Sequence, residues 1–203
     1  MRLNFARPGI LAALVAACAL AAPASAQHPA AKPPDSAAHG AQSGTAGALG
    51  ETPQQFLAKR AGEWTRTIRF VPQPEVQNQP FSGTAKLSAI DGGRFLLEEY
   101  HDVVFGRAIT GTRLFGYNTI TGQYEAAFTG TTSPAIIMLK GTSNDGGKVV
   151  DYSGESETGQ GTKFTLNARV RQVDDDQIVM TFSMTGADGK PNTFQETTYT
   201  RKK

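Results

Sequence analysis

Beyond Gly62, apolar and polar residues alternate along the chain with a period of two. In the stretches 163–170 and 177–184, every second residue is Phe, Leu, Ala, Val, Ile or Met, and most of the others are polar. This pattern is typical of strands that bury one face and expose the other. Clusters of Asn, Asp and Gly separate the stretches and favour tight hairpin turns. We predict about ten strands: 63–71, 81–90, 94–105, 107–117, 122–130, 135–142, 147–155, 161–171, 176–186 and 192–201.

The order of these strands predicts the fold class. No second helical pattern of useful length interrupts them, whereas parallel strands would need long crossover connections. Consecutive hairpins imply an antiparallel up-and-down sheet, and ten such strands would leave open edges unless the sheet closed on itself. We therefore predict an all-β, closed up-and-down barrel, with a β-sandwich as the alternative.

The segment before Gly62 has a different pattern. Thr52 and Pro53 form a helix start, with a capping hydroxyl followed by proline at the first helical position. Phe56 and Leu57 follow at helical spacing, and Gly62 ends the segment. We predict one short N-terminal helix of two or three turns and a β-barrel domain over 51–203.

Several short motifs resemble a known family when their order is taken together. They are Leu57 with Gly62-Glu63-Trp64, Gly92-Gly93-Arg94-Phe95-Leu96, Phe115-Gly116-Tyr117-Asn118, Gly141-Thr142 and Tyr199-Thr200-Arg201. In this respect the chain resembles an uncharacterised family of exported bacterial proteins, the domain of unknown function DUF1579. The resemblance implies a lipocalin-like barrel and no particular reaction. Asn118 stands where an Asp is more usual in the family.

Trp64 and Arg201 are candidates for closing one end of the barrel. As in lipocalin-type barrels, the guanidinium of Arg201 would stack on the indole of Trp64, a cation–π contact that stabilises by about 0.5–2 kcal/mol. We interpret this pair as structural.

The N-terminal segment predicts export. Arg2 and Arg7 precede an apolar run that is too short for a stable membrane-spanning helix, and a small-residue site follows it. We expect a signal peptide over 1–26, cleaved before Gln27, and a periplasmic or secreted product without a transmembrane segment. The alternatives are a membrane anchor and a lipoprotein attached through Cys18.

Residues 27–50 are rich in Ala, Gly, Pro, Ser and Gln and contain one Leu and no aromatic residue. Such a segment cannot bury enough apolar surface to offset the entropy of ordering it. We predict a disordered tether between the signal peptide and the barrel.

Charge and cysteine content exclude some functions. The chain has 20 Lys and Arg and 18 Asp and Glu, and loss of Arg2 and Arg7 with the leader leaves 18 of each. This near-neutral product has no basic cluster typical of nucleic-acid binding. Cys18 is the only cysteine, so a product cut before Gln27 has neither disulfides nor thiolate chemistry.

The stretch 95–105 holds the first candidate ligand site. Glu99 and His101 share an otherwise apolar face, and inside the barrel they would bind a polar head group or a metal. The opposite face of this strand is not much more polar. The alternative is therefore that the register turns Glu99 and His101 to the outside, which we favour because buried charges are rare unless paired.

Arg66 and Arg113 are the second candidate. Arg66 lies between Trp64 and Ile68 on a predicted inner face, where it would receive the carboxylate of a ligand. Pairing of Arg66 with Glu99 or Glu196 is the structural alternative, and Arg113 raises the same choice.

Catalytic and cofactor motifs are absent from the folded part of the sequence. His101 is its only histidine, there is no G-x-S-x-G sequence, and no metal or haem ligand set is present. We predict no metal and no cofactor. A small apolar or amphipathic ligand held in the barrel is the leading functional hypothesis, and an envelope structural or interaction protein with a filled barrel is the alternative. An enzyme that uses Glu99, His101 and an arginine ranks last.

Overall fold

The computed structural model describes residues 51–71, 79–133, 135–157, 161–185 and 189–203. Glu51–Lys203 forms one compact unit. The predicted signal peptide (1–26) with Cys18, and the predicted tether (27–50), lie outside the described residues.

The short N-terminal helix is present as α1 (Pro53–Ala58). The hydroxyl of Thr52 accepts a hydrogen bond from the backbone N–H of Gln55, and the Gln55 side chain accepts one from the backbone N–H of Thr52. This capping box satisfies two backbone donors that would otherwise lack partners. The helix has six residues, fewer than the two or three turns predicted, and buries Leu57 against the barrel.

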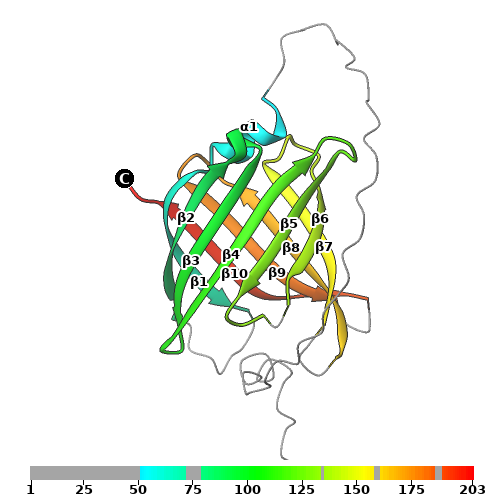
Figure 1. The fold of residues 1–203 in the computed structure, drawn as a ribbon. Helices are drawn as coiled ribbons and strands as arrows, with labels where there is room; N and C mark the ends of the chain where they lie inside the picture. Colours follow the sequence, from blue (N-terminus) through cyan, green and yellow to red (C-terminus); the bar gives the residue numbers. More distant parts are fainter. Residues whose placement is uncertain (1–50, 72–78, 134, 158–160, 186–188) are drawn as a thin grey trace, which may run out of the picture. The chain divides into compact units, whose positions relative to one another are not determined.

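Ten antiparallel strands close into a barrel, because β1 pairs with β10 as well as with β2 (Figure 1). The closed barrel confirms the predicted fold class over the sandwich alternative, and each strand falls within two residues of its predicted bounds. The strands are β1 (Gly62–Phe70), β2 (Phe81–Ile90), β3 (Phe95–Val104), β4 (Arg107–Asn118), β5 (Gln123–Gly130), β6 (Ile137–Thr142), β7 (Val149–Glu157), β8 (Lys163–Gln172), β9 (Gln177–Thr185) and β10 (Pro191–Arg201). A 3₁₀ turn, η2 (Asp91–Gly93), joins β2 to β3.

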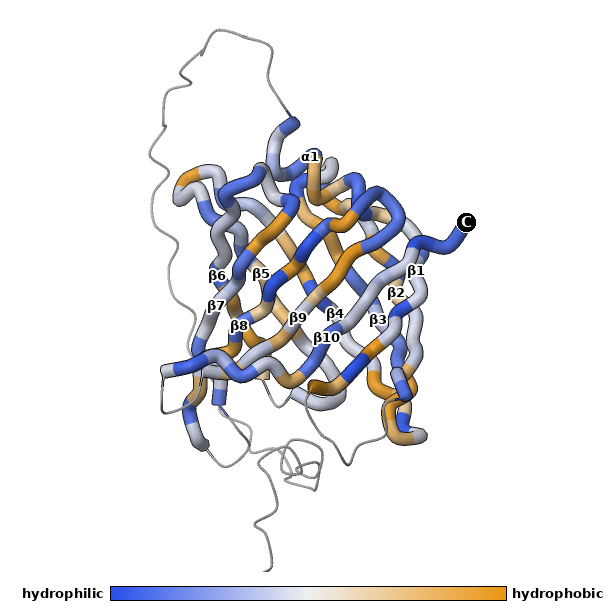
Figure 2. Tube along the Cα trace, turned by 180° about the vertical axis from the view of Figure 1, so that it is seen from behind, coloured by the Kyte–Doolittle hydropathy of each residue, from blue (hydrophilic) through white to orange (hydrophobic). Residues whose placement is uncertain are grey.

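Figure 2 shows the alternation of hydrophobic and hydrophilic positions along the strands. Inward-facing side chains fill the interior, with rings from several strands in edge or stacked contact, such as Phe115 with Phe128 and Phe128 with Phe182. In β8 and β9 the buried rows are the ones that the period-two pattern predicts. Burial of these rows on a shared interior is the main stabilising term of the fold.

The end of the barrel that carries α1 is closed by arginine side chains. Trp64 is fully buried, and its Nε1 donates a hydrogen bond to the backbone carbonyl of Arg60 (3.0 Å). The guanidinium of Arg201 lies 4.2 Å from the centre of the Trp64 ring and donates to the carbonyls of Lys59 and Ala61. Arg60 is itself buried and donates to the carbonyl of Gly147. The predicted stacking partners therefore lie in contact where the helix meets the barrel.

At the opposite end, called the distal end here, β1, β3, β5, β7 and β9 end and β2, β4, β6, β8 and β10 begin (Figure 1). The distal end lacks a helix among the described residues. The interior thus has an α1 side, closed by Trp64 and the arginines, and a distal side.

Candidate functional site

Four charged side chains meet inside the barrel, about midway along the strands. They are Arg66 on β1, Glu98 and Asp102 on β3, and Arg113 on β4, and all four are buried. We call them the charged layer. β4 is the neighbour of β3, and β2 lies between β3 and β1, so the sheet brings together charges that are far apart in sequence.

Small residues on neighbouring strands make room for this layer. Gly83 pairs with Asp102 across β2 and β3, and a Cβ at Gly83 would overlap the Asp102 carboxylate. Gly111 pairs with Tyr100 across β3 and β4, and a Cβ there would overlap the tyrosine hydroxyl. The two glycines therefore permit bulky polar side chains on the inner face of β3.

Two hydrogen-bonded ion pairs hold the charged layer together. Arg66 Nη1 donates to both carboxylate oxygens of Asp102, at 2.9 and 2.7 Å. Arg113 Nη1 donates to Glu98 Oε1 at 2.9 Å and to the hydroxyl of Tyr199 at 2.8 Å. Tyr199 in turn donates to Glu98 Oε1 at 2.8 Å. The layer carries two positive and two negative charges, so it is balanced without a ligand.

Burial and pairing perturb the pKa values of this layer in different directions. Burial raises the pKa of Asp102 above its usual range, against the opposing pull of Arg66 and Arg113. Burial alone would lower the pKa of Arg113, but the attraction of Glu98 and of the neighbouring tyrosines outweighs it and raises the pKa. Burial also raises the pKa of the Tyr199 hydroxyl. Arg113 therefore stays charged, and Tyr199 stays protonated at neutral pH.

Arg66 has hydrogen-bonding capacity that its neighbours leave unused. Its Nε and Nη2 atoms are buried, and neither has a hydrogen-bond partner among the described residues. The Nε atom lies 3.9 Å from Glu98 Oε1, beyond hydrogen-bond distance. The guanidinium instead stacks on the rings of Tyr100 and Tyr199, 4.3 and 5.1 Å from their centres. Cation–π contact compensates part of the cost of burying this charge.

Two members of the charged layer have slightly exposed side chains. The side chains of Arg113 and Asp102 are 7% and 6% exposed, against 0% for Arg66 and 1% for Glu98. Asp102 is the member nearest the distal end of β3. The small exposure of the layer is therefore concentrated at Asp102 and Arg113.

A ring of half-buried apolar side chains lies on the distal side. Its members face inward from β4, β6, β8, β9 and β10 and pack against the core. We call this set the distal ring: Ile109, Ile137, Phe164, Met184 and Phe194.

The α1 side of the layer is packed. A cavity there has a volume of about 20 Å³ and is bounded by apolar side chains together with Arg60, Glu98 and Tyr199. That volume holds roughly one water molecule and excludes an organic ligand.

The structure separates the residues predicted to bind a ligand. Arg66 and Arg113 face the interior, whereas Glu99 and His101 are exposed on the outer face of β3. The outward alternative is therefore the correct one for Glu99 and His101, and a role for them inside the barrel is excluded. The reason is register, since the inner face of β3 is the one that lies opposite Gly83 and Gly111.

Sequence reasoning missed the true partners of the two arginines. Arg66 pairs with Asp102 rather than with Glu99 or Glu196, and Arg113 pairs with Glu98. The available signal was the glycine content of the flanking strands, which marks where a neighbouring inner side chain is large.

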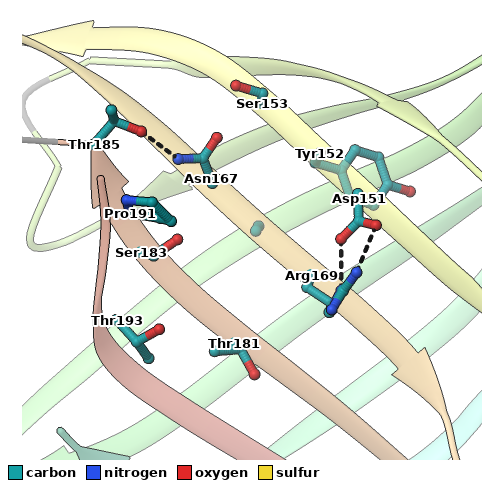
Figure 3. A pocket seen from close by; sticks show the side chains of 11 residues that line it. Asp151, Tyr152, Ser153, Asn167, Arg169, Thr181, Ser183, Thr185, Pro191 and Thr193 are labelled. Carbon is teal, nitrogen blue, oxygen red and sulfur yellow. Dashed lines mark hydrogen bonds and ion pairs between the residues drawn. The ribbon is translucent and has the colours of Figure 1, made fainter. Parts of the chain in front are cut away.

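A shallow groove of about 590 Å³ lies on the outer face over β7 to β10 (Figure 3). Its lining is polar, and the exposed ion pair between Arg169 and Asp151 crosses it, with N–O distances of 2.6 and 2.9 Å. Asn167 donates to the hydroxyl of Thr185 beside it. These two pairs satisfy much of the polar lining, while Tyr152, which also lines the groove, has a buried hydroxyl without a hydrogen-bond partner among the described residues.

The family follows from comparison with known sequences. The family model described as "Protein of unknown function (DUF1579)" matches residues 51–201. The chain belongs to the DUF1579 family. The match covers the whole barrel, and it assigns no activity. No curated protein matches this DUF1579 chain in sequence.

Two solved structures are similar to this DUF1579 barrel. It is similar to Rv2717c from M. tuberculosis, with 16% sequence identity and a TM-score of 0.50, over 74% of this chain and 98% of that one. It also matches the S-type phycobiliprotein lyase CpeS from Guillardia theta, with 12% identity and a TM-score of 0.44, over 75% and 94% of the two chains. At 16% identity, the likeness to Rv2717c concerns the fold alone.

Two further properties of the DUF1579 chain concern its described residues. None of the helices there is long and apolar enough to cross a lipid bilayer. No three His, Cys, Asp or Glu side chains in that part of the chain are grouped so that they could hold a metal ion.

Proposed function

We propose that this protein binds a small amphipathic anion on the distal side of the barrel. The carboxylate of the ligand meets the charged layer, and its apolar chain lies against the distal ring. The observation that carries the proposal is that the Nε and Nη2 atoms of Arg66 are buried without hydrogen-bond partners among the described residues.

The electrostatics favour an anion over a neutral molecule. Arg113 stays charged in the folded protein, and a guanidinium can bind a carboxylate through two parallel hydrogen bonds. A buried donor without a partner costs free energy, which a ligand oxygen would recover. Because the Arg66 side chain is fully buried and paired with Asp102, binding requires this pair to shift toward the ligand.

The packing limits where the apolar part of the ligand lies. The cavity on the α1 side is too small for an organic molecule, so the chain of the ligand has to lie on the distal side. Phe164, Met184 and Phe194 are only partly buried there. They would complete their burial on the ligand, which favours a short alkyl chain or a small ring system.

The test compares two probes with the same chain, dodecanoate and dodecanol, by isothermal titration calorimetry on the purified barrel. We expect dodecanoate to bind more tightly, and Arg113→Gln to weaken the binding of dodecanoate without affecting that of dodecanol. The matched control is Arg169→Gln, in an ion pair on the outer surface, which should leave both affinities unchanged. Circular dichroism verifies that each variant is folded.

A second variant keeps the proposal testable if Arg113→Gln does not fold. Ile137→Gln changes the distal ring and leaves the charged layer intact, and it should weaken the binding of both probes. Failure of both probes to bind, or equal binding by wild type and variants, would overturn the proposal.

One observation favours the alternative of a structural or interaction protein with a filled barrel. The α1 side is packed to within about 20 Å³, and the charges of the layer balance one another. Native mass spectrometry of protein purified from cells distinguishes the two functions, because a barrel without a ligand gives only the mass of the chain.

Export is part of the same proposal. The sequence over 1–26 supports a periplasmic or secreted product, with lipid attachment at Cys18 as the alternative. The intact mass of the protein from the native host decides between them. A chain that begins at Gln27 supports export, a lipid-modified chain that begins at Cys18 supports anchoring, and an uncleaved chain overturns both.

A further inference from the structure

Exposed apolar side chains gather at the distal end. Five of the seven large apolar residues that are exposed among the described residues lie there: Val71, Val103, Phe105, Ile136 and Met138. We call these five the distal patch. Figure 2 shows hydrophobic positions at this end of the tube. Water-exposed apolar groups concentrated at one end of a barrel indicate a surface that meets another phase or partner.

Phe105 is placed by an unusual turn. It forms the two-residue β3–β4 hairpin loop with Gly106, and both residues have positive φ, of 50° and 73°. Asn, Asp and Gly are the usual residues at such positions, and a bulky side chain is disfavoured there. Phe105 nevertheless remains 57% exposed. The turn alone does not explain a phenylalanine at this position.

The rings of Phe70 and Phe81 support the Phe105 side chain. The centre of the Phe105 ring lies 4.6 Å from that of Phe81, in an edge contact, and 6.2 Å from that of Phe70, in a stacked one. The exposed ring is thus held in place before any partner binds, which lowers the entropy cost of binding.

A second apolar projection stands on the other side of β4 and β5. Ile136, which precedes β6, is 66% exposed, and Met138 on β6 is 61% exposed. The outward positions between the two projections are uncharged, namely Ala108, Thr110, Ala127 and Thr129. No carboxylate on the outer faces of β4 and β5 near this end opposes contact with a lipid surface.

Two exposed arginines lie near Phe105 among the described residues. Arg107 follows it directly and is exposed, and Arg69 is exposed on β1. Among the described carboxylates on β1, β3, β4 and β10, Glu196 lies opposite Arg69 across β1 and β10, and Asp102 faces inward and binds Arg66. Cations beside exposed apolar groups match the phosphates that lie above the acyl chains of a bilayer.

We propose that the distal end docks on the surface of an anionic lipid bilayer. Phe105 and Ile136 enter the boundary between head groups and acyl chains, while Arg107 meets the phosphates. Two separate convex projections suit a fluid boundary, because a protein partner would need one continuous, closely packed surface. This docking does not depend on ligand binding inside the barrel.

Vesicle co-sedimentation tests the proposal. The protein used is residues 51–203, since this unit contains the closed barrel and every buried residue described above. Vesicles of phosphatidylcholine alone are compared with vesicles that contain about 30% phosphatidylglycerol. We expect binding to the anionic vesicles, reduced at least about tenfold in the double variant Phe105→Ser/Ile136→Ser.

Two further variants make the result specific. Arg107→Gln should weaken binding to anionic vesicles and leave binding to neutral ones unchanged. Ile120→Ser is the matched control, because Ile120 is 94% exposed in the β4–β5 turn at the α1 end, and it should have no effect.

A fluorescence measurement reports insertion directly. Residues 51–203 contain no cysteine, so Phe105→Cys and Ile120→Cys each give one site for an environment-sensitive dye. The emission should shift to the blue on anionic vesicles only for the dye at position 105. Absence of binding to both kinds of vesicle, unchanged binding of the double variant, or light scattering that shows the distal patch buried in a dimer would overturn the proposal.

Discussion

Replacing Glu98 by Gln removes one charge from the centre of the barrel and keeps the shape of the side chain. Glu98 is 1% exposed and accepts hydrogen bonds from Arg113 and Tyr199. Without its carboxylate, the charged layer holds two arginines and one aspartate. Breaking a buried ion pair by removing one partner costs about 3–5 kcal/mol, because the other charge is left uncompensated. A domain is typically stable by about 5–15 kcal/mol, so Glu98→Gln should remove a large fraction of the stability.

Urea unfolding measures this loss. Trp64 is the only tryptophan in the chain and is fully buried, so its fluorescence reports unfolding of the barrel. With a denaturant slope of about 1–3 kcal/mol per molar urea, the unfolding midpoint should fall by more than about 1 M.

The matched control is an ion pair of similar geometry on the surface. Arg169 Nε lies 2.6 Å from Asp151 Oδ1, and the two side chains are 60% and 55% exposed. Asp151→Asn should cost about 0–1 kcal/mol, because water screens the pair. The double variant Glu98→Leu/Arg113→Met removes both charges of the buried pair and should recover much of the loss. A Glu98→Gln variant no less stable than Asp151→Asn would refute the reasoning.

Three other predictions concern the interior. Because burial raises the pKa of Asp102, the folded protein holds its proton more tightly than the unfolded chain. The free energy of unfolding should therefore fall as pH rises from about 4 to the raised pKa of Asp102. In urea unfolding measured across pH, Asp102→Asn should lack this fall. Identical pH profiles for the wild type and Asp102→Asn would contradict the prediction. Gly111→Ala places a Cβ against the hydroxyl of Tyr100 and should cost about 1–3 kcal/mol, seen as a lower Tm, whereas an unchanged Tm would show that the ring moves freely. Arg201→Leu removes the cation above Trp64 and should cost about 0.5–2 kcal/mol and increase quenching of the indole by acrylamide, while unchanged quenching would rule out a closing role.

The interior of β3 shows why the site was only partly predictable. Arg66 on β1 was predicted to face inward or to pair, because it stands between Trp64 and Ile68 on one face, and Arg113 on β4 raised the same choice. Their partners stand in β3, where both faces combine apolar and charged residues. Periodicity cannot choose between such faces, because a shift of one residue exchanges them. The choice depends on Gly83 and Gly111 on the neighbouring strands, which leave room for the side chains on one face only.

By itself, the sequence determined the number, order and approximate bounds of the strands, the helix before them and the closed antiparallel barrel. These features depend on local alternation and turn residues, which act over a few neighbouring positions. Only the tertiary structure decided which carboxylates meet Arg66 and Arg113, how little space remains on the α1 side, and that Phe105 stands exposed beside Phe70 and Phe81. Those features depend on the pairing register of strands far apart in the chain, and a register is fixed only when all ten strands close around one interior.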